Sequence, residues 1–187
     1  MVFLPSKGYY QSMKTLIKVL ILLLFAAEVF FPSIYMSRAT LIPMFVAMVV
    51  LVIVYWFLMY WVSKKKAIQI LGKEPQFDIF VGKIPTDPSA DLTRGRLCIV
   101  DDTISLIQKT DGKESKTTPY KIVWTMPTSS VTSIGFGKVL SIRKGFILYM
   151  DIDDVRFTCS KIGKHKEALY KALGWNFETK PEETKTK

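Results

Sequence analysis

The sequence has 187 residues, a hydrophobic content of 49% and a formal net charge of +10. The first 66 residues hold seven basic side chains and one acidic side chain, which leaves +4 for the remainder. This distribution favours anionic lipid as a partner. It argues against a nucleic-acid-binding domain, which would carry a dense basic patch interleaved with aromatic residues. The residues from about 72 onward mix short apolar runs with polar residues, and they suffice to bury a core of their own.

The longest apolar run, residues 41–62, has no charged side chain and is followed almost at once by Lys64, Lys65 and Lys66. At about 1.5 Å per residue, a helix of this length crosses a hydrocarbon core of roughly 30 Å. We therefore predict a transmembrane helix over 41–62. We expect the helix to continue past the lysines to residue 71, with Gly72 as its stop.

A second apolar stretch, residues 13–35, precedes this run and is interrupted by Lys18 and Glu28. Ionisable groups within a membrane span are costly and often functional, but both of these lie toward the ends of the stretch. The short gap at 32–40 suits a tight turn, so the two stretches predict a transmembrane hairpin within 13–71. A cleavable signal peptide is the alternative, because Lys14, Lys18 and the small residues at 26–27 also fit that pattern.

The orientation of the predicted hairpin follows from its flanking charges. Basic residues border the start of the first stretch and the end of the second, whereas the connection holds only Arg38. The positive-inside rule then places both termini in the cytoplasm of a multi-pass protein of the inner (plasma) membrane. Residues 1–12 are expected to form a cytoplasmic surface segment.

Residues 72–93 contain three prolines and two glycines and are predicted to form a linker with one strand-like piece at 77–81. From residue 94 the apolar pattern has a period of two, which is typical of strands. A helical spacing follows through Ile162, His165, Leu169 and Leu173 and ends at Gly174. The charged tail, 177–187, is expected to be disordered. The predicted strands are 96–100, 103–109, 120–126, 131–136, 139–142, 145–151 and 155–159.

The region 94–176 resembles a pleckstrin-homology-like (PH-like) domain of the bacterial PH or GRAM type. The resemblance is carried by an opening hairpin at 95–106, a polar step into a strand at 126–134, two later strands and the closing helix. It implies an α+β fold, in which a small antiparallel β-barrel with a C-terminal helix follows the membrane hairpin. Many bacterial members of the family follow two transmembrane helices. The first hairpin loop lacks the dense Lys/Arg cluster on which phosphoinositide-binding members rely.

No residue pattern indicates an enzyme, a cofactor or a metal site. His165 is the only histidine, which excludes sites built from several histidines. The carboxylates of Asp151, Asp153 and Asp154 are interpreted as a hairpin turn, because the glycine and ligand spacing of a calcium loop are missing. Cys98 and Cys159 lie in apolar strand-like runs and are predicted to be reduced core residues.

These observations predict a membrane-anchored, non-enzymatic interaction module, a subunit or accessory of a larger membrane protein assembly. The alternative is an anionic-lipid-binding domain at the membrane surface, suggested by a basic turn at 143–145 with Lys138 close by. The expected partners are membrane lipids and other membrane proteins, and no nucleic acid. The candidate lipid- or partner-binding residues are Glu28, Lys64, Lys65, Lys66, Lys138, Arg143 and Lys144.

Overall fold

A computed structural model describes residues 7–30, 37–87, 89–110, 118–151 and 153–175. The chain divides into two compact units, Met1–Trp61 with Asp111–Thr118, and Val62–Thr110 with Pro119–Lys187. The predicted tail, 177–187, lies outside the described residues.

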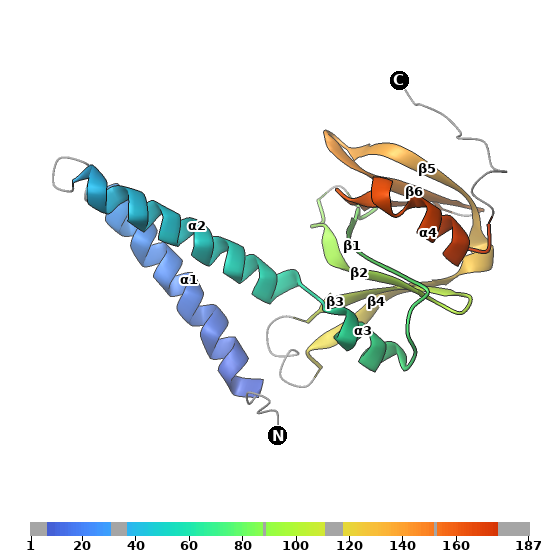
Figure 1. Cartoon of the computed structure of the whole chain (residues 1–187), viewed down its shortest axis with the longest axis horizontal. Helices are drawn as coiled ribbons and strands as arrows, with labels where there is room; N and C mark the ends of the chain where they lie inside the picture. The colour runs from blue at the N-terminus through green and yellow to red at the C-terminus, as the bar shows by residue number, and fades with distance from the viewer. Residues whose placement is uncertain (1–6, 31–36, 88, 111–117, 152, 176–187) are drawn as a thin grey trace. The chain divides into compact units, whose positions relative to one another are not determined.

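The first unit is a pair of helices, α1 (Lys7–Phe30) and α2 (Arg38–Tyr60), which lie side by side (Figure 1). Many of their large apolar side chains face outward, among them Leu22, Phe30 and Ile42. Within the described residues, one helical stretch, Ala39–Leu71, is long and apolar enough to cross a membrane. The charges of Lys14, Lys18 and Glu28 make α1 less apolar than α2.

The predicted single helix to residue 71 is broken into two helices. The backbone is extended at Trp61 and at Ser63, and a separate helix, α3 (Lys64–Leu71), begins after Ser63. The Ser63 hydroxyl accepts a hydrogen bond of 3.4 Å from the backbone N–H of Lys66, as an N-terminal cap does. Gly72 ends α3 with a φ of 75°, which confirms it as the stop.

The second unit is built on one antiparallel sheet of seven strands in the order β4-β3-β2-β1-β7-β6-β5 (Figure 1). The strand predicted near residue 77 exists but is central, since β1 hydrogen-bonds to β2 on one side and to β7 on the other. The predicted linker at 72–93 is therefore wrong in this respect, because it contains the middle strand of the sheet. The strands are β1 (Phe77–Lys83), β2 (Thr93–Val100), β3 (Thr103–Lys109), β4 (Tyr120–Pro127), β5 (Val131–Leu140), β6 (Arg143–Met150) and β7 (Val155–Thr158).

The basic turn predicted at 143–145 is also wrong. Strand β5 runs unbroken to Leu140, the turn lies at Ser141 and Ile142, and Arg143 already belongs to β6. Ser141 takes the left-handed conformation, with a φ of 49°, which a tight turn between strands requires. The pattern at 139–142 therefore mixes the end of a strand with a turn.

The neighbouring strand β7 lies very close to Gly145 of β6. A Cβ atom built on Gly145 would lie 1.9 Å from the carbonyl oxygen of Phe157 in β7. Gly95 in β2 is similar, since its Cβ would lie 2.3 Å from the carbonyl oxygen of Ile107. The two glycines permit close backbone approaches that any side chain would prevent.

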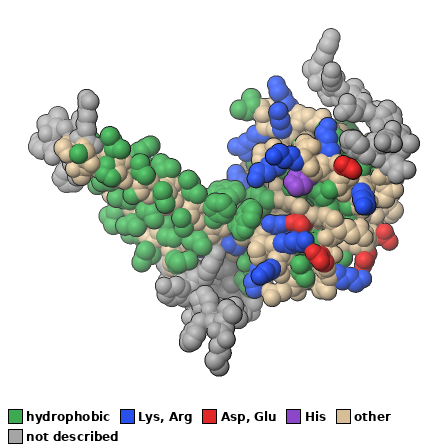
Figure 2. Space-filling model, viewed as in Figure 1, with side chains coloured by type: hydrophobic (Ala, Val, Ile, Leu, Met, Phe, Trp, Pro, Cys, Tyr) green, Lys and Arg blue, Asp and Glu red, His purple; other side chains and the backbone are tan. Residues whose placement is uncertain are grey.

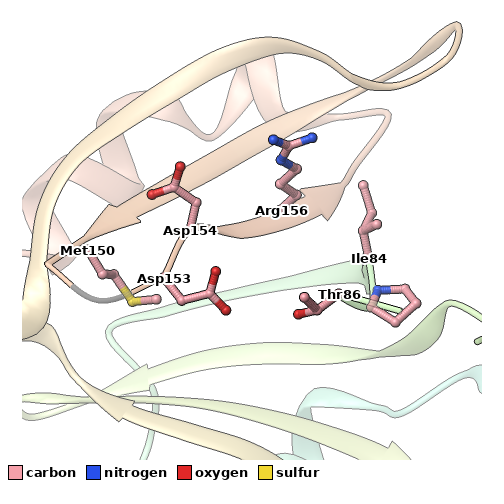
Figure 3. A pocket seen from close by; sticks show the side chains of 7 residues that line it. Ile84, Thr86, Met150, Asp153, Asp154 and Arg156 are labelled. Carbon is pink, nitrogen blue, oxygen red and sulfur yellow. The ribbon is translucent and has the colours of Figure 1, made fainter. Parts of the chain in front are cut away.

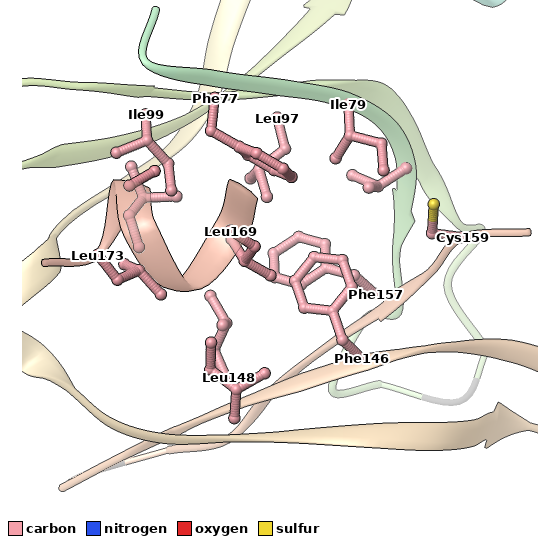
Figure 4. Close-up of a cluster of buried hydrophobic side chains, with 14 of the residues drawn as sticks. Phe77, Ile79, Leu97, Ile99, Phe146, Leu148, Phe157, Cys159, Leu169 and Leu173 are labelled. Carbon is pink, nitrogen blue, oxygen red and sulfur yellow. The ribbon is translucent and has the colours of Figure 1, made fainter. Parts of the chain in front are cut away.

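The sheet curves so that side chains of β1–β3 and of β5–β7 enclose one apolar core (Figure 4). The rings of Phe146 and Phe157 stack at its centre with centroids 5.1 Å apart. A 3₁₀ turn, η3 (Ile162–Lys164), and helix α4 (Lys166–Ala172) add Ile162, Leu169 and Leu173 to the core. The predicted burial of Ile162, Leu169 and Leu173 is thus confirmed, but the helix begins only at Lys166, after the 3₁₀ turn. Gly174, with a φ of 74°, follows it.

A smaller apolar cluster joins α3 to the sheet. Val62, Ala67, Cys98 and Ile107 are all fully buried in it. Cys98 thus belongs to a different cluster from its neighbours Leu97 and Ile99, which belong to the main core. Strand β2 is therefore buried on both faces.

Candidate functional site

The three basic residues predicted to gather near one turn do gather at the end of the β5–β6 hairpin. Lys138 and Lys144 are direct partners in the antiparallel ladder, and Arg143 faces Leu140 at the last pair before the turn. All three side chains are exposed. We call Lys138, Leu140, Ile142, Arg143 and Lys144 the basic hairpin end.

A like-charge pair at Lys138 and Lys144 is unfavourable for the sheet itself. Directly opposed like charges destabilise an antiparallel pair. Among the described residues, no ion pair or side-chain hydrogen bond neutralises Lys138, Arg143 or Lys144. The whole hairpin between Val131 and Met150 contains no acidic residue. The arrangement therefore leaves a positive potential at this end of the hairpin, and an anion from outside the domain would neutralise it.

A further cation reaches this end of the domain from α4. The Nζ atom of Lys166 lies 4.7 Å from the ring centroid of Phe136, a cation–π contact. Phe136 is two residues from Lys138 on β5, hence on the same face of that strand. The exposed Lys161 and Lys164 lie on the segment after β7, whose 3₁₀ turn contacts β6. Figure 2 shows the resulting group of Lys and Arg side chains where Figure 1 draws the hairpin and α4.

An apolar side chain occupies the tip of this hairpin. Ile142 is 84% exposed, the highest value among the large hydrophobic residues that the structure describes, those of α1 and α2 included. Leu140, next to the turn, is 38% exposed. Turn positions normally carry Gly, Asn, Asp, Ser or Pro, so an isoleucine here is not explained by the turn.

The lysines that follow the long apolar helix make local contacts in α3. The Nζ atom of Lys64 lies 2.8 Å from a carboxylate oxygen of Glu74, and that of Lys66 lies 2.9 Å from the side-chain oxygen of Gln69. Both contacts are exposed to solvent. Lys65 is exposed as well. The five predicted lysines and one arginine thus fall into two separate groups, one in α3 and one at the basic hairpin end.

Glu28 lies near the end of α1 and is half-buried. One of its carboxylate oxygens, Oε1, is buried, and no hydrogen-bond partner for it is found among the described residues. The side chain of Arg38, the basic residue of the connection that follows, lies outside the described part of the chain.

An opening at the other end of β6 is lined by charges of both signs (Figure 3). Its volume is about 440 Å³, and Asp153, Asp154 and Arg156 are among its walls. Met150 and Asp153 also line a neighbouring space of about 320 Å³ that reaches Trp124. The predicted acidic turn therefore forms part of a cleft wall, but the mixed charges favour neither anions nor cations.

The two cysteines are buried and not joined by a disulfide, which confirms the prediction that they are free core residues. Burial raises the pKa of the Cys98 thiol to about 12, with a further contribution from the nearby carboxylate of Asp78. Burial also raises the pKa of Cys159. His165 packs edge-on against Phe77, with ring centroids 6.4 Å apart. Within the described residues, no group of three His, Cys, Asp or Glu side chains is placed to hold a metal ion.

Two features escaped the sequence analysis. One is the exposed Ile142, which the periodicity assigned to a strand. The other is Arg96, which donates a hydrogen bond of 2.7 Å from Nε to the carbonyl oxygen of Val62 and pairs with Asp78. An arginine inside an apolar strand run was a signal for such a buried pair, since arginine is rarely buried alone.

Comparison of the sequence with protein-family models finds no matching family, and no curated protein matches the chain. What the structure defines is an α+β protein with a seven-stranded antiparallel sheet and a separate helical pair.

Proposed function

We propose that this chain is a membrane-anchored, non-enzymatic interaction module, a subunit or accessory of a larger membrane protein assembly. In this proposal α1 and α2 form a transmembrane hairpin with both termini in the cytoplasm. The sheet domain is a PH-like barrel that binds a protein partner. The strand order, in which β1 joins a group of four strands to a group of three, and the closing α4 support the PH-like assignment.

The way the chain enters the sheet domain is the observation that carries this function. Val62 is fully buried, its carbonyl oxygen is held by Arg96, and Ala67 is packed in the same cluster. The folded domain therefore starts at the residue directly after Trp61, without a free linker between them. In this proposal the sheet domain follows the membrane anchor directly in the sequence, which suits a partner within the same membrane.

Site-specific crosslinking in native membranes tests the partner. A photoreactive residue replaces Ser129, an exposed position in the turn between β4 and β5. Incorporation at Lys65, an exposed residue of α3, serves as a second probe of the same domain. We expect a crosslinked species of defined mass that contains another membrane protein and is purified with it in constant ratio. Recovery of the uncrosslinked chain alone, from both positions, would contradict the proposal.

Cysteine labelling tests the proposed topology. Ser37→Cys lies at the start of α2 and is expected to react with a membrane-impermeant reagent outside intact cells. Ser129→Cys in the sheet domain is expected to react only after the membrane is opened. The buried Cys98 and Cys159 give little background. Labelling of Ser129→Cys from outside would place the sheet domain on the opposite side and remove the cytoplasmic-partner proposal.

A second candidate function is binding of an anionic lipid surface, favoured by the opposed Lys138 and Lys144. Each basic residue near an anionic membrane contributes about 1 kcal/mol. The full chain in phosphatidylcholine nanodiscs is mixed with vesicles that contain phosphatidylglycerol. Changing Lys138, Arg143 and Lys144 together to Gln is expected to lower vesicle binding about a hundredfold, since each 1.4 kcal/mol is tenfold. The control triple of Lys73, Lys109 and Lys121 to Gln removes the same charge elsewhere and is expected to have a much smaller effect.

A further inference from the structure

We infer that the basic hairpin end is a membrane-insertion element: Ile142 enters the interfacial region of an anionic bilayer while Lys138, Arg143 and Lys144 contact the headgroups. This inference rests on the second candidate function, the binding of anionic lipid. It adds the mode of contact, the residue that enters the bilayer and the reason for its exposure.

Ile142 occupies an unusual position for an apolar side chain. Its side chain is 84% exposed at a turn whose preceding residue, Ser141, has a φ of 49°. The core of the domain is complete without it, since the buried cluster draws on Ile134 and Phe146 from the same two strands. An isoleucine that is exposed to water at this position does not stabilise the fold. Transfer of its side chain to an apolar phase is favourable.

The side chains around Ile142 are a second apolar residue and several basic residues. The described sheet domain has three exposed large hydrophobic side chains, and two of them, Leu140 and Ile142, lie at this one tip. Basic side chains stand on both strands directly behind them, with Lys138 opposite Lys144. Apolar residues ahead of cations are the arrangement with which peripheral elements enter an anionic membrane interface.

An anionic bilayer fits these side chains better than a soluble acidic protein does. A soluble acidic protein would satisfy the cations but would need a pocket for an isolated isoleucine at a protruding turn. An anionic bilayer supplies both, because its headgroups are negative and its acyl boundary accepts an apolar side chain without a shaped pocket. The loop between β1 and β2 supports the same choice by contrast, since residues 84–92 hold two aspartates and no basic residue.

An environment-sensitive fluorophore tests insertion directly. The full chain carries the dye on Ile142→Cys, or on Ser129→Cys as the matched control, and is placed in phosphatidylcholine nanodiscs. Vesicles of phosphatidylcholine with or without phosphatidylglycerol are then added, and a second set of nanodiscs contains phosphatidylglycerol itself. We expect a blue shift and quenching by brominated lipid for the dye at 142 whenever phosphatidylglycerol is present, and no change for the dye at 129.

Binding by unlabelled variants completes the test. Ile142→Ser is expected to weaken binding to the anionic bilayer about tenfold. Ile122→Ser, at an exposed isoleucine of β4 that lies away from the hairpin, is expected to leave it unchanged. If anionic vesicles bind but the dye at 142 does not respond and Ile142→Ser binds normally, insertion is wrong and surface binding stands. If no anionic membrane binds the chain beyond the neutral control, the lipid function fails together with this inference.

Discussion

Arg96 and Val62 are 34 residues apart in the sequence and are joined by a hydrogen bond of 2.7 Å from the guanidinium Nε to the carbonyl oxygen. The same guanidinium pairs with the carboxylate of Asp78, and its side chain is only 10% exposed. One side chain of β2 therefore fixes both the neighbouring strand β1 and the first residue of the folded domain. This contact helps to explain why α3 belongs to the sheet domain and is not the predicted continuation of α2.

Replacing Arg96 by Met should destabilise the sheet domain by about 3 kcal/mol. The apolar side chain leaves the carboxylate of Asp78 and the carbonyl of Val62 largely buried without their donor. Chemical unfolding followed by tryptophan fluorescence measures the loss, and hydrogen exchange shows whether the amides of α3 open first. Lys73→Gln is the control, because its ion pair with Asp101 is exposed on both sides. An equal loss in both variants would mean that the buried contact has no special role.

Gly145→Ala should destabilise the domain by about 1–3 kcal/mol, because the new Cβ cannot fit beside the carbonyl oxygen of Phe157. Gly137 is its direct partner in the β5–β6 ladder and has open space where a Cβ would stand. Gly137→Ala should therefore be neutral or slightly stabilising. Thermal unfolding of the two variants decides the matter, and similar melting temperatures would contradict the close approach of β6 and β7.

A fragment that begins at residue 90 should not fold, whereas one that begins at Val62 should. The shorter fragment lacks β1, whose removal separates β2 from β7 and takes Phe77, Ile79 and Val81 out of the core. Dispersion of amide signals in NMR spectra distinguishes the two outcomes. A folded fragment from residue 90 would show that β1 is dispensable and that the sequence-based boundary at residue 94 was adequate.

Cys98 gives the domain a predictable response to alkaline pH. Burial raises the pKa of its thiol from 9.0 to about 12. The unfolded chain loses this proton first, so the stability linked to Cys98 is present in full below pH 9.0 and is lost as the pH rises toward about 12. Cys98→Ala should remove that part of the slope. Alkylation of Cys98 near neutral pH should be at least about a hundredfold slower in the folded chain than in urea.

The sequence predicted the positions of the strands better than it predicted which strands pair in the sheet. The strands near residues 103 and 120 have almost the expected bounds, because alternation and the Asp101–Asp102 turn mark them locally. β1 was recognised as a strand, but nothing local shows that its partners are β2 and β7, which lie at different distances along the chain. Pairing between distant strands depends on tertiary contacts that periodicity does not contain.

The basic hairpin end was predicted in composition and missed in geometry. Lys138, Arg143 and Lys144 were grouped correctly by their proximity in the sequence. The turn was placed on the wrong residues, because a Lys-Gly step resembles a turn and Ser141-Ile142 resembles the end of a strand. The carbonyl of Phe157, more than ten residues later, explains why the glycine is needed within the strand. The opposed lysines and the exposed isoleucine follow only from the true register.

The central position of β1 has a consequence for the order of events during synthesis. β1 to β4 follow one another as neighbours, and β5 to β7 do the same, so each group consists of local pairings that form quickly. Only β1 and β7 join the groups, and the Thr158 hydroxyl that bonds to the Gly82 carbonyl comes 76 residues later. The ribosome must therefore release nearly the whole domain before its sheet is complete. Until then the apolar faces of both half-sheets stay open to water, in a chain whose hydrophobic segments at 13–62 have already emerged.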